Sequence, residues 1–195
     1  MKKNALIALL TLLGLTLELN AQESSFTTKV EQGKVTTGIG NKDVAILRST
    51  LTISDNTGVA DFQQVTGKII ASSLKDVKGI RAYFATNAQE LYIDKKHAMK
   101  WRENNGMLFA KGKVAKDGTY TIRGNKKLTP GTYYLWIALD ISTKANEGNT
   151  VDATITSYII DGKELLEPNG NPANAATIFL TESSVLMPMD KGSLS

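Results

Sequence analysis

One stretch near the middle of the chain constrains the fold more than any other, the run PGTYYLWIALDI at residues 130–141. Successive side chains of an extended strand point to opposite faces of a sheet. One face of this run is therefore an unbroken apolar row, formed by Tyr133, Leu135, Ile137, Leu139 and Ile141. The other face is amphipathic and carries Tyr134, Trp136, Ala138 and Asp140. A strand with a continuous apolar face and a partly apolar second face is typical of the middle of a β-sandwich.

The aromatic rings of the second face allow two interpretations. Tyr134 and Trp136, with Tyr158 from a later stretch, could form a platform on which a sugar ring stacks. The same rings could instead pack inside the domain or against a neighbouring domain. A central strand that is covered on both sides has this composition, so the residues alone favour packing.

The rest of the chain also has the pattern of short strands separated by turns. Residues 43–55 alternate between apolar and polar side chains, and a change of phase near Ser49 predicts a β-bulge. Two hairpins are predicted, one over residues 106–124 with its turn at Asp117-Gly118, and one with its turn at Asp161-Gly162. Further strands are expected at 79–86 and 175–182, and one helical turn after Ser142 or Thr143, ending at Gly148. This spacing predicts an antiparallel sandwich or barrel.

The N-terminus has the pattern of a secretory signal peptide over residues 1–21. Lys2 and Lys3 precede an apolar run from residue 5 to 17, and Leu19-Asn20-Ala21 is suitable for cleavage. The apolar run is shorter than the roughly 20 residues that span a bilayer, which makes a retained anchor the less favoured alternative. We therefore expect an exported protein, periplasmic, at the outer surface or secreted, with no transmembrane segment after signal removal.

The composition excludes several kinds of chemistry. The chain has no cysteine, so it can form neither a disulfide nor a thiolate metal site. The net charge of +4 is small and the basic residues are dispersed, which argues against nucleic-acid binding. His97 is the single histidine and lies among lysines, as expected of a surface residue.

No motif for a nucleophile, a bound phosphate or zinc is present. Asp140, Glu147 and Asp152 lie near the aromatic strand and are the carboxylates that could form a glycosidase pair. Asp140 and Asp152 are also ordinary residues beside turns, and this second interpretation is favoured. The sequence thus predicts no catalytic, cofactor-binding or metal-binding residue, and no cofactor.

The order of the segments resembles that of a known family. The runs VAILRSTLTI (44–53) and VTGKIIASSLKDVKGIRAYFAT (65–86) are followed by the pattern L-x-x-G-x-Y-Y-x-W-x-x-x-D-I-x-x-x-A-x-x-G-N at residues 128–149. Together they resemble the N-terminal domain of BNR-repeat neuraminidases, over roughly residues 26–182. The resemblance implies an all-β fold, an antiparallel, jelly-roll-like β-sandwich with little helix, that precedes a catalytic propeller in secreted sialidases.

The resemblance also implies a domain division. Residues 22–182 would form the sandwich, and residues 183–195 would be a connector towards a catalytic propeller absent from this sequence. In the family an Arg-Ile-Pro segment follows the connector, and its arginine binds the carboxylate of sialic acid; neither this segment nor an aspartate box occurs here. The catalytic roles of a sialidase therefore cannot be assigned to Arg48, Arg81, Arg102 or Arg123.

Three functions are compatible with these observations. The first is a non-catalytic accessory domain of an exo-α-sialidase acting on sialoglycans, with the propeller as its partner. The second is a free-standing secreted glycan-binding module that uses Tyr134, Trp136 and Tyr158. The third is a structural or adhesin-like sandwich that binds proteins. Together with the resemblance, the missing catalytic motifs favour the first.

Overall fold

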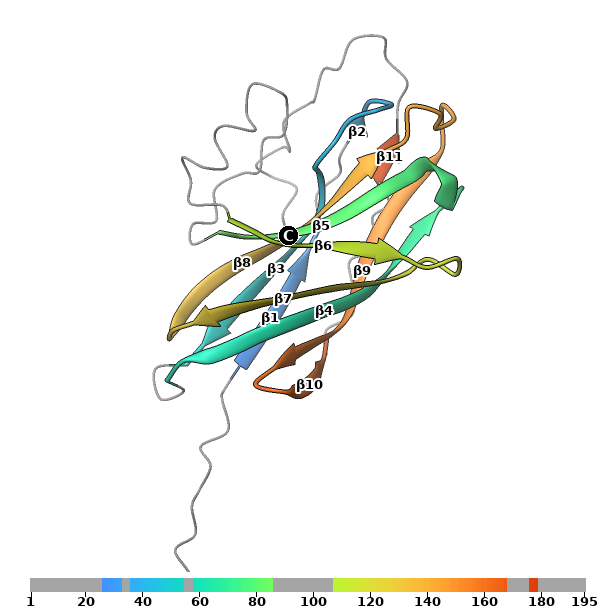
Figure 1. Cartoon of the computed structure of the whole chain (residues 1–195). Coiled ribbons are helices and arrows are strands. Elements are labelled where there is room, and N and C mark those ends of the chain that lie inside the picture. Colours follow the sequence, from blue (N-terminus) through green and yellow to red (C-terminus); the bar gives the residue numbers. More distant parts are fainter. Residues whose placement is uncertain (1–25, 33–35, 55–57, 86–106, 168–175, 179–195) are drawn as a thin grey trace, which may run out of the picture.

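The computed structural model describes residues 26–32, 36–54, 58–85, 107–167 and 176–178, which are coloured in Figure 1. These residues form strands joined by short turns, together with one turn of 3-10 helix. The elements are β1 (Phe26–Glu31), β2 (Thr36–Thr37), β3 (Val44–Ile53), β4 (Ala60–Ala71), η1 (Leu74–Asp76), β5 (Val77–Ala85), β6 (Met107–Val114), β7 (Thr119–Leu128), β8 (Gly131–Ile141), β9 (Thr150–Ile160), β10 (Lys163–Leu166) and β11 (Ala176–Ile178).

The strands form two sheets that are continuous through one shared strand. The hydrogen-bonded order is β1-β3-β8-β5-β6-β7-β4-β9-β11-β2, and β10 pairs with β9. We call β1, β3, β8 and β5 the first sheet, and β7, β4, β9, β10, β11 and β2 the second sheet. The strand β6 pairs with β5 on one side and with β7 on the other, so the whole curls into a sandwich (Figure 1). All the pairs are antiparallel except β11 with β2, which confirms the predicted all-β, jelly-roll-like class.

The hydrophobic core lies between the two sheets. The predicted apolar row of β8 is part of it, and Leu135, Ile137, Leu139 and Ile141 are all buried. Phe62 of β4 meets Phe84 of β5 edge to face, with 5.1 Å between ring centroids, and meets Phe109 of β6 at 5.2 Å. Such edge-to-face contacts stabilise the packing beyond the burial of area, and here they join both sheets through β6.

Several β-bulges interrupt the strand pairing and change which residues face the core. Ile46 is the extra residue in β3, because Ala45 pairs with Ala138 and Leu47 with Ile137. A bulge in this strand was predicted from the sequence, but near Ser49, three residues away from its observed position. Thr156 is the extra residue in β9, and Gln63 marks an irregularity in β4. Two more lie at Phe109 of β6 and Lys78 of β5. The bulge in β3 places both Ile46 and Leu47 in the core cluster.

The predicted turns are present. Gly118 in the β6–β7 hairpin has φ +86°, and Asp161 and Gly162 in the β9–β10 hairpin have φ of 50° and 74°. Positive φ at both central residues is the geometry of the tight turn that joins twisted strands. After β8, the Ser142 hydroxyl accepts a hydrogen bond from the backbone N–H of Lys144 at 3.0 Å, and Gly148 has φ +77°. The prediction of a helical turn here was wrong: the segment forms turns only, and η1 is the one helical element among the described residues.

Some predicted features lie outside the described residues. They are the signal peptide at 1–21, His97, and the connector at 183–195. The predicted last strand is described only as β11. Within the described ranges, no helix has the length and hydrophobicity required to cross a bilayer.

Candidate functional site

The face of the first sheet that points away from the core carries a row of aromatic and charged side chains. Pairing in register places Leu108 of β6, Tyr83 of β5, Trp136 of β8, Arg48 of β3 and Glu31 of β1 side by side. Side chains directly opposite each other on adjacent strands lie on the same face and interact. The predicted amphipathic face of residues 130–141 is therefore part of a wider surface that crosses five strands.

Trp136 is packed within this row. Only 2% of its surface is exposed, and Ala45, Tyr83 and Tyr134 surround it. The guanidinium of Arg48 lies 5.4 Å from the Trp136 ring centroid and 5.5 Å from that of Tyr134. These are cation–π distances, so Arg48 contacts the rings of both Tyr134 and Trp136.

Arg48 is neutralised by a carboxylate next to it. Its Nη2 lies 2.6 Å from Oε2 of Glu31, and both side chains are buried. Burial alone would raise the pKa of Glu31, but the hydrogen bonds and charges of Arg48 and Lys29 outweigh it and leave this pKa below its ordinary value. Glu31 therefore ionises more readily in the folded protein than in the unfolded chain.

Tyr158 does not join these rings. It lies fully buried between the sheets, within 2.7 Å of the Ser49 hydroxyl and 2.8 Å of a Glu167 carboxylate oxygen. Its ring lies 6.1 Å from that of Phe62. Burial is the main reason that the pKa of its hydroxyl is raised. The structure thus brings Tyr134 and Trp136 together on one face and places Tyr158 in the core.

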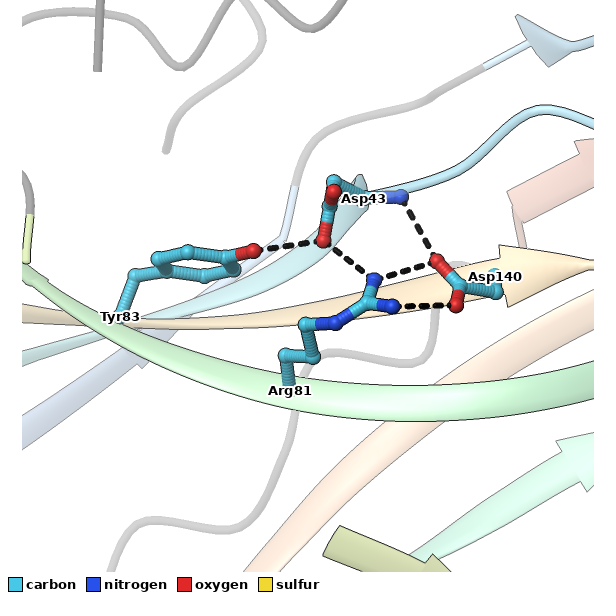
Figure 2. A network of polar contacts seen from close by, with 4 residues as sticks. All are labelled: Asp43, Arg81, Tyr83 and Asp140. Carbon is cyan, nitrogen blue, oxygen red and sulfur yellow. Dashed lines mark hydrogen bonds and ion pairs between the residues drawn. The ribbon is translucent and has the colours of Figure 1, made fainter. Parts of the chain in front are cut away.

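A second network adjoins the row at the end of β8. Figure 2 shows Arg81 of β5 between two carboxylates, those of Asp140 and Asp43. The Arg81 guanidinium binds both oxygens of Asp140, at 2.5 and 2.7 Å, and Asp43 at 2.5 Å. The Tyr83 hydroxyl donates to Asp43 at 2.6 Å, and the backbone N–H of Asp43 donates to Asp140 at 3.0 Å. The network joins β5, β8 and the start of β3.

The charges of this network are paired with one another, because Arg81 lies between Asp43 and Asp140. The bond to Asp140 is the main reason that the pKa of Arg81 is raised, and desolvation and Asp43 raise that of Tyr83. Bidentate pairs of this kind are strong and geometrically specific. Asp43 adopts a positive φ of 55°, uncommon for a residue other than glycine, and its contacts hold it there. Both oxygens of Asp140 are therefore engaged in binding Arg81.

The three carboxylates considered for glycoside hydrolysis are held in different places. Asp140 is bound by Arg81 on the first sheet, and Asp152 accepts hydrogen bonds from Gln32 and from the Ala153 backbone on the second sheet. Glu147 is exposed in the turn between β8 and β9. A glycosidase pair needs two carboxyl groups about 5–10 Å apart on either side of the glycosidic bond that is cleaved. The described residues also contain no cluster of three or more acidic or metal-binding side chains that could hold a metal ion.

Sequence reasoning missed the Arg81 network because it treated the four arginines as dispersed. The available signal was the alternation of Arg81 and Tyr83 on one face of a strand, with Asp140 on the amphipathic face of another. Only the pairing of Arg81 with Ala138 and of Gly79 with Asp140 shows that these faces meet.

Comparison with known proteins now identifies the fold. The family model described as the N-terminal domain of BNR-repeat neuraminidase matches residues 27–164. The chain belongs to this family. The match covers both sheets from β1 into β10, and so includes the Trp136 row and the Arg81 network.

A solved structure has the same fold as this BNR-associated N-terminal domain. It is the Hadza microbial sialidase Hz136, which aligns with a TM-score of 0.54 and 9% sequence identity. The alignment covers 77% of this chain and 30% of the sialidase chain. This chain therefore corresponds to less than a third of that enzyme. No curated protein matches the sequence.

Proposed function

We propose that this β-sandwich is a non-catalytic accessory domain of a secreted exo-α-sialidase, and that it acts by packing against the catalytic propeller. The observation that carries the proposal is the family match over residues 27–164. The fold shared with 30% of a sialidase chain supports it.

The side chains support a structural role for this domain. Asp140 is bound to arginine and Asp152 to amides, as a stabilising network requires, and Glu147 is exposed in a turn. The burial of Trp136 and Tyr158 favours packing over sugar stacking. Recognition of a sialic acid carboxylate calls for converging arginines, whereas Arg48 and Arg81 are both occupied by carboxylates.

A sialidase assay with a fluorogenic sialoside tests the proposal. Three proteins would be compared: this chain, the same chain continued through the coding sequence downstream of Ser195, and that downstream part alone. We expect no turnover by this chain, turnover by the continued protein, and a lower melting temperature for the downstream part alone. Turnover by this chain would overturn the proposal, as would a downstream sequence that encodes no propeller.

We also propose that residues 1–21 direct export and are removed. The support is the pair of lysines followed by an apolar run and a small-residue cleavage site. After expression in a bacterium with a periplasm, the N-terminal sequence of the protein from the periplasmic fraction should begin at Gln22. Protein that starts at Met1 or remains in the cytoplasm would contradict this.

A further inference from the structure

The outer face of the second sheet differs from that of the first because its central part, where β6, β7 and β4 pair, is basic, polar and open to solvent. Tyr120 and Ile122 of β7 are buried in the core, so the residues that alternate with them point outward. The in-register pairs Thr121 with Thr66, Thr119 with Lys68, and Arg123 with Gln64 extend this face onto β4. Lys113 of β6 pairs with Thr121 and extends it to a third strand.

Three cations stand on this face, those of Lys68, Lys113 and Arg123, and all three side chains are exposed. None of them forms an ion pair with a described residue. Two carboxylates border the face. Asp117 is bound to the backbone and hydroxyl of Thr119, and Asp152 is bound to Gln32 and Ala153. The face therefore has a net positive charge.

Arg123 forms a hydrogen bond with a neighbouring side chain of β4. Its Nε–H donates to Oε1 of Gln64 at 2.8 Å, and Nε2 of Gln64 donates to the Thr66 hydroxyl at 2.9 Å. This chain of bonds engages the Nε–H of Arg123 and leaves its two Nη groups with no partner among the described residues. Two parallel N–H donors are the arrangement that recognises a carboxylate or sulfate group.

We propose that this face, which we call the Arg123 face, binds acidic carbohydrate. The carboxylate or sulfate of the glycan would lie against the Nη groups of Arg123. Lys68 and Lys113 would supply further positive charge, and the hydroxyls of Thr66 and Thr121 would bind sugar hydroxyls. From Gln64 to Lys68 and from β4 to β6 the face measures roughly 14 by 10 Å, which accommodates an oligosaccharide.

The composition of the Arg123 face favours a glycan over other anionic partners. Binding of single-stranded nucleic acid relies on aromatic rings that stack on the bases, and the positions named on this face carry none. Protein interfaces usually have an apolar core, whereas the centre of this face carries hydroxyl, amide and charged groups, and the exposed Ile70 lies at its edge beyond Lys68. The proposal does not depend on a catalytic propeller, so binding by this chain alone tests it.

The first test is binding of the purified chain to immobilised glycans by surface plasmon resonance. The probes are 3′-sialyllactose, chondroitin sulfate and lactose, which distinguish carboxylate, sulfate and neutral ligands. We expect binding to at least one acidic probe at physiological salt, and weaker binding as salt rises. The proposal is overturned if neither acidic probe binds, if lactose binds equally well, or if polyuridine or polyglutamate is preferred to both.

Variants then locate the site. Lys68→Gln, Lys113→Gln and Arg123→Gln together should weaken binding at least tenfold. The matched control is Lys42→Gln, Lys78→Gln and Lys144→Gln, which removes the same charge from exposed positions off this face. Arg123→Lys keeps the charge but loses the two parallel donors, so it should weaken binding severalfold even if the triple variant folds poorly. An equal loss in the control, or no loss in Arg123→Lys, would overturn the assignment.

Discussion

At the scale of single residues, the stability of the first sheet depends on the buried ion pair of Arg48 and Glu31. Arg48 lies over two aromatic rings and against a carboxylate, and little of either charged side chain is exposed. Breaking a buried ion pair by removing one partner costs about 3–5 kcal/mol. Glu31→Leu should therefore lower the free energy of unfolding by about 3 kcal/mol, measured by urea denaturation at pH 7.

A second substitution distinguishes the loss of one charge of the pair from the change in side-chain packing. The double variant Glu31→Leu with Arg48→Met removes both charges and should recover much of the stability, because apolar groups can replace a buried pair at little cost. The pKa of Glu31 is lowered in the folded state, so the contribution of this carboxylate is full above its ordinary pKa and is lost as pH falls through the folded value. A double variant less stable than Glu31→Leu alone would contradict the argument.

Folding shifts the pKa of Asp152 in the opposite direction to that of Glu31. Asp152 is buried on β9, and desolvation raises its pKa despite hydrogen bonds from Gln32 and Ala153. A carboxyl whose pKa is raised by folding stabilises the protein below its unfolded pKa, and that contribution is lost as pH rises through the folded pKa. Asp152→Asn keeps an oxygen that can accept the same hydrogen bonds but cannot ionise. Its urea midpoint relative to wild type should therefore rise between pH 3.5 and pH 7, and a relative midpoint that falls would refute this.

At the scale of elements, β4 is the strand on which the second sheet depends, since it pairs with both β7 and β9. Gly67 lies at its centre, beside the extra residue of β9. A Cβ at this position would lie 1.8 Å from the Thr154 carbonyl oxygen and 2.5 Å from the Tyr120 hydroxyl. Backbone cannot yield as a flexible side chain does, so Gly67→Ala should destabilise the protein by about 3 kcal/mol or more.

Gly58 provides a matched control for this substitution. It precedes the same strand, has φ +72°, and would place a new Cβ near no other atom. Gly58→Ala should cost only the strain of a left-handed residue, about 1 kcal/mol. Both values follow from urea denaturation monitored by circular dichroism. Similar losses in the two variants would show that backbone strain, and not the clash with Thr154, governs Gly67.

The same elements show how far the sequence predicts the fold. The alternation in β8 and the Asp-Gly turns were sufficient to predict the all-β class and both hairpins. These signals depend only on residues that are neighbours in the sequence. The strand β4 was not predicted by its alternation. Its core residues Phe62 and Val65 are three positions apart, since Gln63 interrupts the period of two.

The candidate site could be predicted less fully, for a related reason. The sequence correctly placed Tyr134 and Trp136 on one face of one strand. Tyr158 was grouped with them, but the extra residue at Thr156 changes the phase of β9. Val151, Ala153 and Ile155 face the core before the bulge, and Tyr158 and Ile160 face it afterwards. A bulge depends on the partner strand, so it is weakly encoded in the sequence of either strand alone.

At the scale of the whole molecule, the two sheets should unfold as one unit. They share β6, which pairs with both, and they share one continuous core that includes residues of β3, β4, β8 and β9. The Ser49–Tyr158 hydrogen bond adds a polar link between the sheets. A domain with a single core of this kind loses its structure cooperatively, so neither sheet should persist without the other.

Trp136 allows this cooperativity to be measured. The chain contains two tryptophans, so in a Trp101→Phe variant the fluorescence reports on the first sheet through Trp136 alone. Far-UV circular dichroism reports on all strands. The two urea transitions should coincide, and a reducing agent should leave them unchanged because the chain has no cysteine. A fluorescence transition separated from the dichroism transition would show that the first sheet unfolds independently, and β6 would then be a hinge between two units instead of a shared strand.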